Sequence, residues 1–167
     1  FKIHNLMDVI RDVRELCGAQ LKQEGIELDV PAEVEEMPLF AEVDAKGIHR
    51  VLLNLINNSE HAVLSKHDAS RVKPGERIGS IRINARFSEN KEYVTISVAD
   101  DGVGVAKEDL ASIFELFVSS KGMAGSGLGL AVTKRIIKAH EGKVSASSEK
   151  GKGCTIAFTI PVSHNEG

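Results

Sequence analysis

Apolar residues recur every three or four positions in three stretches of the chain, at 5–24, 48–63 and 128–140. This spacing is typical of helices that bury one face, so the pattern predicts three long helices. Asp44 precedes the second stretch and is expected to act as its N-cap. A further short helix is expected at 107–117.

Between these stretches, apolar and polar residues alternate, which is the pattern of strands with one buried face. The alternation predicts strands at 26–30, 39–43, 81–85, 93–98, 144–148 and 154–160. Short turns join the third strand to the fourth and the fifth to the sixth, which indicates hairpins. The predicted fold class is therefore α+β: a two-layer α/β sandwich, in which about three helices cover one face of a mixed, mostly antiparallel sheet of about five strands.

The chain has 167 residues, of which 42% are hydrophobic and 27% are charged, so we expect a single domain, 1–167, with a real core. A net charge of -3 argues against a nucleic-acid surface. No apolar run approaches the roughly 18 residues of a membrane span and no secretory leader is present, so we expect a cytoplasmic domain without direct membrane contact. The start at Phe1 suggests a fragment of a longer polypeptide.

Cys17 and Cys154 lie far apart and form no CxxC pair, which suggests neither a zinc site nor a disulfide. We expect two reduced, mostly buried thiols.

The second predicted helix carries a polar stripe made of Asn54, Asn58 and His61, spaced by four and three residues. Asparagine is a poor helix former, so its repetition here indicates a purpose beyond folding. A neutral amide oxygen can complete the shell of a Mg²⁺ ion that already holds phosphate oxygens. Asn58 is therefore the predicted metal ligand, and Asn54 and His61 are predicted to contact the phosphates. The alternative is an ordinary polar face of an amphipathic helix.

A predicted strand ends at Asp100, and Gly102 and Gly104 follow it. A carboxylate at this place can accept a hydrogen bond from an exocyclic amine, while glycines let the backbone approach a flat ring. Adenine offers such an amine, and guanine at the same edge does not. The alternative is an ordinary turn, for which this sequence is also common.

A glycine-rich segment opens the last predicted helix, and free amides at a helix N-terminus bind anions. Its residues are Gly125, Ser126, Gly127, Leu128 and Gly129. The segment is neither a P-loop nor a Rossmann fingerprint. Lys121, just before it, is placed to reach a terminal phosphate, although a solvated surface lysine is the alternative.

Taken in this order, the segments 54–59, 100–104 and 125–130 resemble the N box and two glycine boxes of the catalytic, ATP-binding domain of sensor histidine kinases. The segment 114–117 resembles the phenylalanine box, and Gly151 and Gly153 form a third glycine pair. The resemblance covers 44–161. It implies the Bergerat fold, with a left-handed β-α-β arrangement shared with gyrase, MutL and the heat-shock chaperone ATPases.

Within this resemblance Asn58 binds Mg²⁺, Asp100 binds adenine, and 118–126 forms the lid over ATP. The implied activity is transfer of the ATP γ-phosphoryl to a histidine on a separate dimerisation domain of the same parent protein, which is absent from this chain, and onward signalling to a response regulator. The helix at 5–24 would join the core to the linker. Cys154 stands where the family usually has threonine or serine, and the lid is short, which together imply modest ATP affinity.

Hydrolases of the superfamily carry a glutamate one helical turn before the metal asparagine, to orient water. Here that position is Asn54, which cannot act as a base, so we expect slow hydrolysis. A serine kinase of the anti-sigma type and an ATP-gated binding module without chemistry remain alternatives. Asn54 and the acidic pI of about 6.1 disfavour a gyrase-like ATPase. Neither His67 nor His140 lies on a long dimerisation helix that would present a phosphoacceptor.

Overall fold

The computed structural model describes residues 1–67, 73–115 and 128–162. Its elements, in chain order, are β1 (Lys2–Asn5), α1 (Leu6–Gln23), β2 (Ile26–Asp29), α2 (Ala32–Glu35), β3 (Phe40–Val43), α3 (Ala45–Lys66), β4 (Gly79–Phe87), β5 (Tyr93–Asp100), α4 (Lys107–Leu110), α5 (Leu128–Ala139), β6 (Val144–Glu149) and β7 (Gly153–Pro161).

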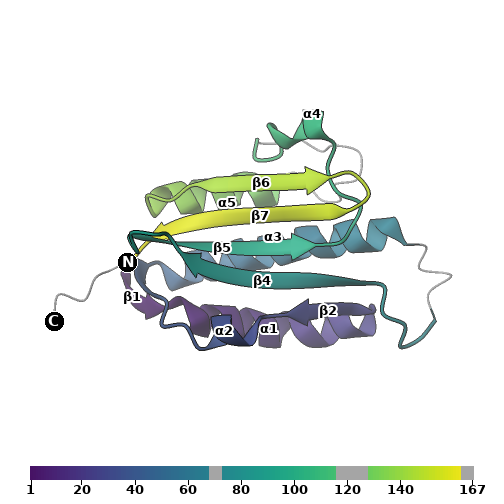
Figure 1. Ribbon diagram of the computed structural model, residues 1–167, viewed down its shortest axis with the longest axis horizontal. Helices are drawn as coiled ribbons and strands as arrows, with labels where there is room; N and C mark the ends of the chain where they lie inside the picture. Colours follow the sequence, from purple (N-terminus) through teal and green to yellow (C-terminus); the bar gives the residue numbers. More distant parts are fainter. Residues whose placement is uncertain (68–72, 116–127, 163–167) are drawn as a thin grey trace.

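The strands form a five-stranded sheet in the order β2-β4-β5-β7-β6. Strand β2 runs parallel to β4, and the other neighbouring pairs are antiparallel. Helices α1, α3 and α5 lie together behind this sheet, as Figure 1 shows. The predicted fold class, a two-layer sandwich with a mixed and mostly antiparallel sheet, is confirmed.

The core lies between the helices and one face of the sheet. Strand β4 alternates buried apolar residues with exposed polar ones, and β5 and β7 follow the same alternation. Helix α3 contributes buried side chains to this core on most of its turns. These residues are Ile48, Val51, Leu52, Leu55, Ile56, Ser59 and Val63. Because α3 is enclosed by the sheet, α1 and α5, its orientation is strongly fixed.

Helix α1 begins where the sequence predicts. The Oδ1 atom of Asn5 accepts a hydrogen bond from the backbone N–H of Met7 at 3.1 Å, and another from that of Leu39 at 3.3 Å. Asp8, in the first turn of α1, forms an ion pair with Arg11. At the other end, Gly25 has a φ of 81°, in the region that favours glycine, and the helix ends before it.

Four features differ from the sequence-based expectation. Helix α2 was not predicted. Strand β1 was not predicted, and it pairs with β3 in a separate two-stranded sheet. Asp44 precedes α3 as expected but makes no capping hydrogen bond with its side chain. Helix α4 ends at Leu110, because the next bonds connect residues three apart, such as that from the N–H of Ser112 to Asp109, and form turns through 115.

No helix in the described part of the chain has the length and apolar character needed to cross a membrane.

Two carboxyl groups meet where α1 packs on α3. Atom Oε2 of Glu24 is buried and lacks a donor if both groups are ionised, yet the Glu60 carboxyl lies within hydrogen-bonding reach of it. Burial and the neighbouring Glu24 charge raise the pKa of Glu60. A protonated Glu60 can donate to Glu24, whereas an ionised Glu60 cannot. The same environment, burial first and the Glu60 charge second, raises the pKa of the Cys17 thiol.

We expect Glu60→Gln to raise the melting temperature at pH 8 by about 1–3 °C, the scale of a charge interaction of up to about 1 kcal/mol. Because the pKa of Glu60 is raised, the folded state binds more protons than the unfolded state, and stability falls as pH rises through that pKa. The amide of glutamine donates to Glu24 at any pH. The gain should therefore vanish as the pH falls through the raised pKa of Glu60, because its protonated carboxyl then donates as glutamine does.

Thermal unfolding monitored by circular dichroism between pH 4 and 8 measures this difference. Glu15→Gln is the matched control, because it removes the same charge from an exposed position of α1. Equal pH profiles for Glu60→Gln and wild type would contradict the raised pKa of Glu60.

Candidate functional site

Asp100 lies at the end of β5, with its carboxyl group held by three donors. The backbone N–H of Gly102 donates to Oδ1 at 2.9 Å, and the hydroxyl of Ser59 and the backbone N–H of Cys154 also donate to the carboxyl group. Burial raises the pKa of Asp100, and these three hydrogen bonds oppose that rise. The carboxylate is thus desolvated and fixed in orientation.

This donor set leaves capacity for one more partner. An ionised carboxylate accepts about four hydrogen bonds, and the described residues supply three. An exocyclic amine is a suitable fourth donor. The adjacent Asp101 is unsuited to this role, since its carboxylate accepts bonds from the backbone N–H of Ser80 at 3.0 Å and from the Ser80 hydroxyl at 3.4 Å.

The turn after Asp100 lies against the backbone of α3. A Cβ atom at Gly102 would be 2.5 Å from the carbonyl carbon of Ala62, and the N–H of Val103 donates to the Ala62 carbonyl at 3.0 Å. Gly104 has a φ of 71° and its Cα faces the backbone of Glu149. Both glycines therefore allow close backbone approach, here within the protein itself.

Cys154 faces Asp100 across the ladder between β5 and β7. Its thiol is buried, and burial together with the Asp100 charge raises its pKa to about 11, against the effect of a hydrogen bond with Ser148. The thiol therefore stays protonated and is a poor nucleophile. Cys17 and Cys154 are both free, and the second is buried as expected.

The polar stripe of α3 meets the start of α5 at one point. Nδ2 of Asn54 donates to the Gly129 carbonyl at 3.2 Å, and these two residues are 75 positions apart in the chain. Asn58 lies one helical turn further along α3 and is half-buried, while His61 is exposed. Because α5 begins beside Asn54, Asn58 lies just beyond the N-terminus of α5.

The donors near Asn58 suit a cation that brings its own ligands. No group of three or more His, Cys, Asp or Glu side chains that could hold a metal occurs within 1–67, 73–115 and 128–162. A single amide oxygen does not retain Mg²⁺ by itself, but it fits an ion otherwise ligated by phosphates and water. The donor set therefore fits a metal that arrives with a polyphosphate.

Other predicted site residues lie outside the described residues. These are Lys121, Gly125, Ser126, Gly127 and the lid at 118–126. Leu128 and Gly129 are the first two residues of α5.

Ser59 is a site residue that the sequence analysis missed. It is 3% exposed and donates to Asp100. Its neighbours Asn57 and Asn58 are polar, and Asn58 belongs to the predicted polar stripe. Ser59 itself lies four residues after Leu55 and four before Val63, on the apolar stripe. A hydroxyl at a core position needs a buried partner, and this signal was present in the sequence.

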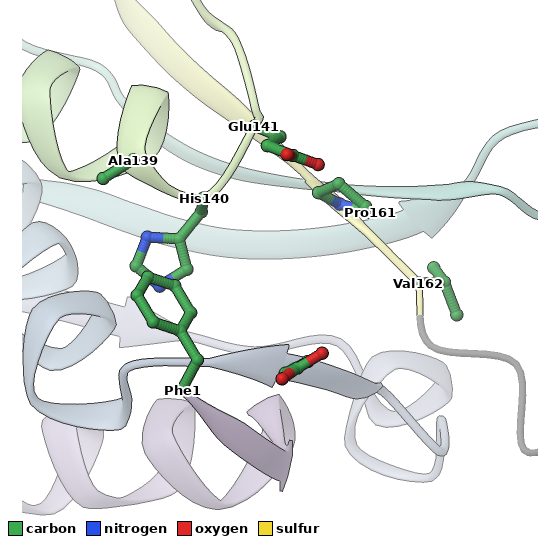
Figure 2. A pocket seen from close by; sticks show the side chains of 7 residues that line it. Phe1, Ala139, His140, Glu141, Pro161 and Val162 are labelled. Carbon is green, nitrogen blue, oxygen red and sulfur yellow. The ribbon is translucent and has the colours of Figure 1, made fainter.

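A separate cavity of about 340 Å³ lies at the far end of α5, and Figure 2 shows the Phe1 ring against His140 there. Nε2 of His140 accepts from the backbone N–H of Asp44 at 3.0 Å, and Nδ1 lies 2.7 Å from the Ile136 carbonyl. This pattern requires a neutral ring with its proton on Nδ1. With both nitrogens engaged and the residue 6% exposed, His140 is a structural link between α3 and α5.

Comparison with known proteins agrees with this geometry. Residues 43–164 match the model of the family described as histidine kinase-, DNA gyrase B-, and HSP90-like ATPase. The sensor histidine kinase WalK of Bacillus subtilis (strain 168) is 34% identical over 74% of this chain and 19% of its own length.

Two solved structures are similar in fold. The catalytic domain of histidine kinase ThkA has a TM-score of 0.74 and 27% identity, with 96% of both chains covered. Full-length ShkA in complex with AMPPNP has a TM-score of 0.74 and 28% identity over 95% of this chain and 30% of that one. The chain thus spans only a part of WalK and ShkA. It belongs to the family of histidine kinase-, DNA gyrase B- and HSP90-like ATPases, with the fold of a histidine kinase catalytic domain.

Proposed function

We propose that this chain is the ATP-binding catalytic domain of a sensor histidine kinase, and that it transfers the γ-phosphoryl of ATP to a histidine on a separate dimerisation domain. Family membership supports this, and the observation that carries it is Asp100: a half-buried carboxylate held by three donors, with capacity for the amine of adenine. A response regulator is the proposed downstream partner, and the cytoplasm, which holds ATP, is the proposed location.

Each described site residue has a proposed task. Asp100 accepts from the adenine amine, Ser59 and Gly102 fix its carboxylate, and Cys154 lines the same end of the sheet. Asn58 supplies an amide oxygen to Mg²⁺, and His61 faces solvent one turn further on, within reach of phosphates. Bound Mg²⁺ would neutralise phosphate charge. The remaining proposed contacts are Gly104, Leu128 and Gly129, together with Gly125, Ser126, Gly127 and Lys121.

The same residues favour transfer over hydrolysis. Helix α3 carries Asn54 one turn before Asn58, and an amide does not take a proton from water. In the described part of α3 the acidic residue is Glu60, which lies beside Glu24 at the end of α1. The proposed reaction therefore depends on positioning, with the histidine nucleophile supplied by the acceptor domain.

Calorimetric titration with a non-hydrolysable ATP analogue, with and without Mg²⁺, tests the nucleotide site. We expect micromolar to sub-millimolar binding by wild type and a loss of about tenfold or more in Asp100→Asn, since a bond to a charged acceptor is removed. Asp101→Asn is the matched control and should bind like wild type, because its carboxylate faces Ser80. Equal binding by Asp100→Asn and wild type would exclude the proposed role of Asp100.

Nucleotide affinity should also fall on acidification. Protonation of Asp100 removes the best acceptor for the amine, and the pKa of Asp100 is raised by burial, so the loss begins above the ordinary aspartate range. Ser59→Ala removes a bond that lowers this pKa and should move the loss to higher pH. Ser80→Ala is the control. Its pH profile includes the titration of ATP itself, as that of Ser59→Ala does, but the hydroxyl that it removes faces Asp101. A Ser59→Ala profile that superimposes on that of Ser80→Ala would refute the assignment.

Transfer itself can be followed with γ-labelled ATP and a separately supplied dimerisation domain of the same parent protein. We expect acid-labile, base-stable label on that domain and little free phosphate, as phosphohistidine and slow hydrolysis require. Acid-stable phosphoserine on a protein acceptor would instead indicate the anti-sigma type of kinase. Binding of ATP without any transfer would indicate a binding module.

A further inference from the structure

Helix α5 is attached to α3 at both of its ends, and the two helices also pack closely against each other. At its C-terminal end, His140 accepts from the Asp44 N–H at 3.0 Å. One helical turn before that end, a Cβ atom at Gly47 would lie only 3.3 Å from Cγ2 of Ile136, so the two helices are in tight contact. At its N-terminal end, Asn54 donates to the Gly129 carbonyl.

The N-terminal attachment lies where α5 is intrinsically weakest. Glycine is among the poorest helix formers, and Gly129 stands in the first turn. Its carbonyl receives two side-chain donors: the Thr133 hydroxyl along α5 at 2.9 Å, and Nδ2 of Asn54 from α3 at 3.2 Å. Thr133 is fully buried, so this pair of bonds lies in a shielded place, where hydrogen bonds are strong.

We propose that Asn54 is a positioning residue whose amide holds the first turn of α5 against α3. This contact sets the separation between the N-terminus of α5 and Asn58, which lies four residues, or roughly 6 Å, further along α3. The effect of this contact on ATP binding rests on the proposed function, in which the phosphates lie between the N-terminus of α5 and Asn58. The attachment itself does not, because it exists without any ligand.

Hydrogen–deuterium exchange of the nucleotide-free protein tests the attachment. In Asn54→Ala we expect amides in the first two turns of α5 to exchange about fivefold faster, as loss of one hydrogen bond implies. Asn54→Asp keeps the shape but turns an oxygen toward the Gly129 carbonyl, so its effect should be at least as large. Asn57→Ala makes the same truncation at an exposed position of α3 and should leave α5 unchanged.

A rescue separates this role from a general loss of stability. Adding Gly129→Ala to Asn54→Ala should restore slow exchange, because alanine stabilises the turn. There is room for it, since a Cβ at Gly129 would meet Cγ of Asn54 at 3.7 Å, an ordinary contact. Unchanged exchange in both Asn54 variants, or faster exchange spread evenly over the whole chain, would overturn the proposal.

Nucleotide titration then distinguishes the two Asn positions. Asn54→Ala should weaken binding of the ATP analogue by a similar factor with and without Mg²⁺, because it acts through α5. Asn58→Ala should lose only the Mg²⁺-dependent part and leave exchange in α5 unchanged. Weakened binding by Asn54→Ala without faster exchange would assign Asn54 to direct phosphate contact and refute positioning. Faster exchange in a protein that binds no nucleotide would keep the attachment and refute the proposed function.

Discussion

The backbone contact between the turn after β5 and helix α3 is the constraint on which the site depends. Gly102 lies against the Ala62 backbone, and Val103 donates to the Ala62 carbonyl. The end of the central strand therefore cannot move without α3, and the same helix carries Ser59 and Asn58. The carboxylate of Asp100 and the amide of Asn58 are thus held in a fixed relation by core packing, before any ligand arrives, which lowers the ordering cost of binding.

The end of β5 carries a negative charge and the adjoining face of α3 carries neutral amides, an arrangement that suits a nucleotide. The half-buried carboxylate of Asp100 lies at the strand end, where a neutral base with an amine would sit, and amides line the helix face beyond it. A polyanion near that face meets no carboxylate of α3, because Glu60 is turned toward α1. On the other face of α3, burial and the neighbouring Glu24 raise the pKa of the half-buried Glu60.

Periodicity was sufficient to predict the three long helices, the two hairpins and the layer arrangement, because each depends on local spacing. It was insufficient wherever a partner is distant in sequence. Strand β1 is short and exposes Ile3, so it exists only through its pairing with β3. The stripe of Asn54, Asn58 and His61 was found from spacing, but the bond from Asn54 to Gly129 spans 75 positions and depends on the tertiary packing of α5. Ser59 was hidden because a serine beside two asparagines resembles more of the same polar surface.

Two glycines of this domain, Gly151 and Gly102, are needed for different physical reasons and have different evolutionary prospects. Gly151 has a φ of 87° but open space around its Cα, so asparagine, which tolerates that conformation, is an accessible replacement. Gly102 has no such conformational demand, and its obstacle is the α3 backbone 2.5 Å from where a Cβ would be. No side chain of any kind fits there unless strand and helix separate. Sequence drift can therefore pass through the hairpin glycine, whereas the glycine beside Asp100 has no single-substitution route away from it.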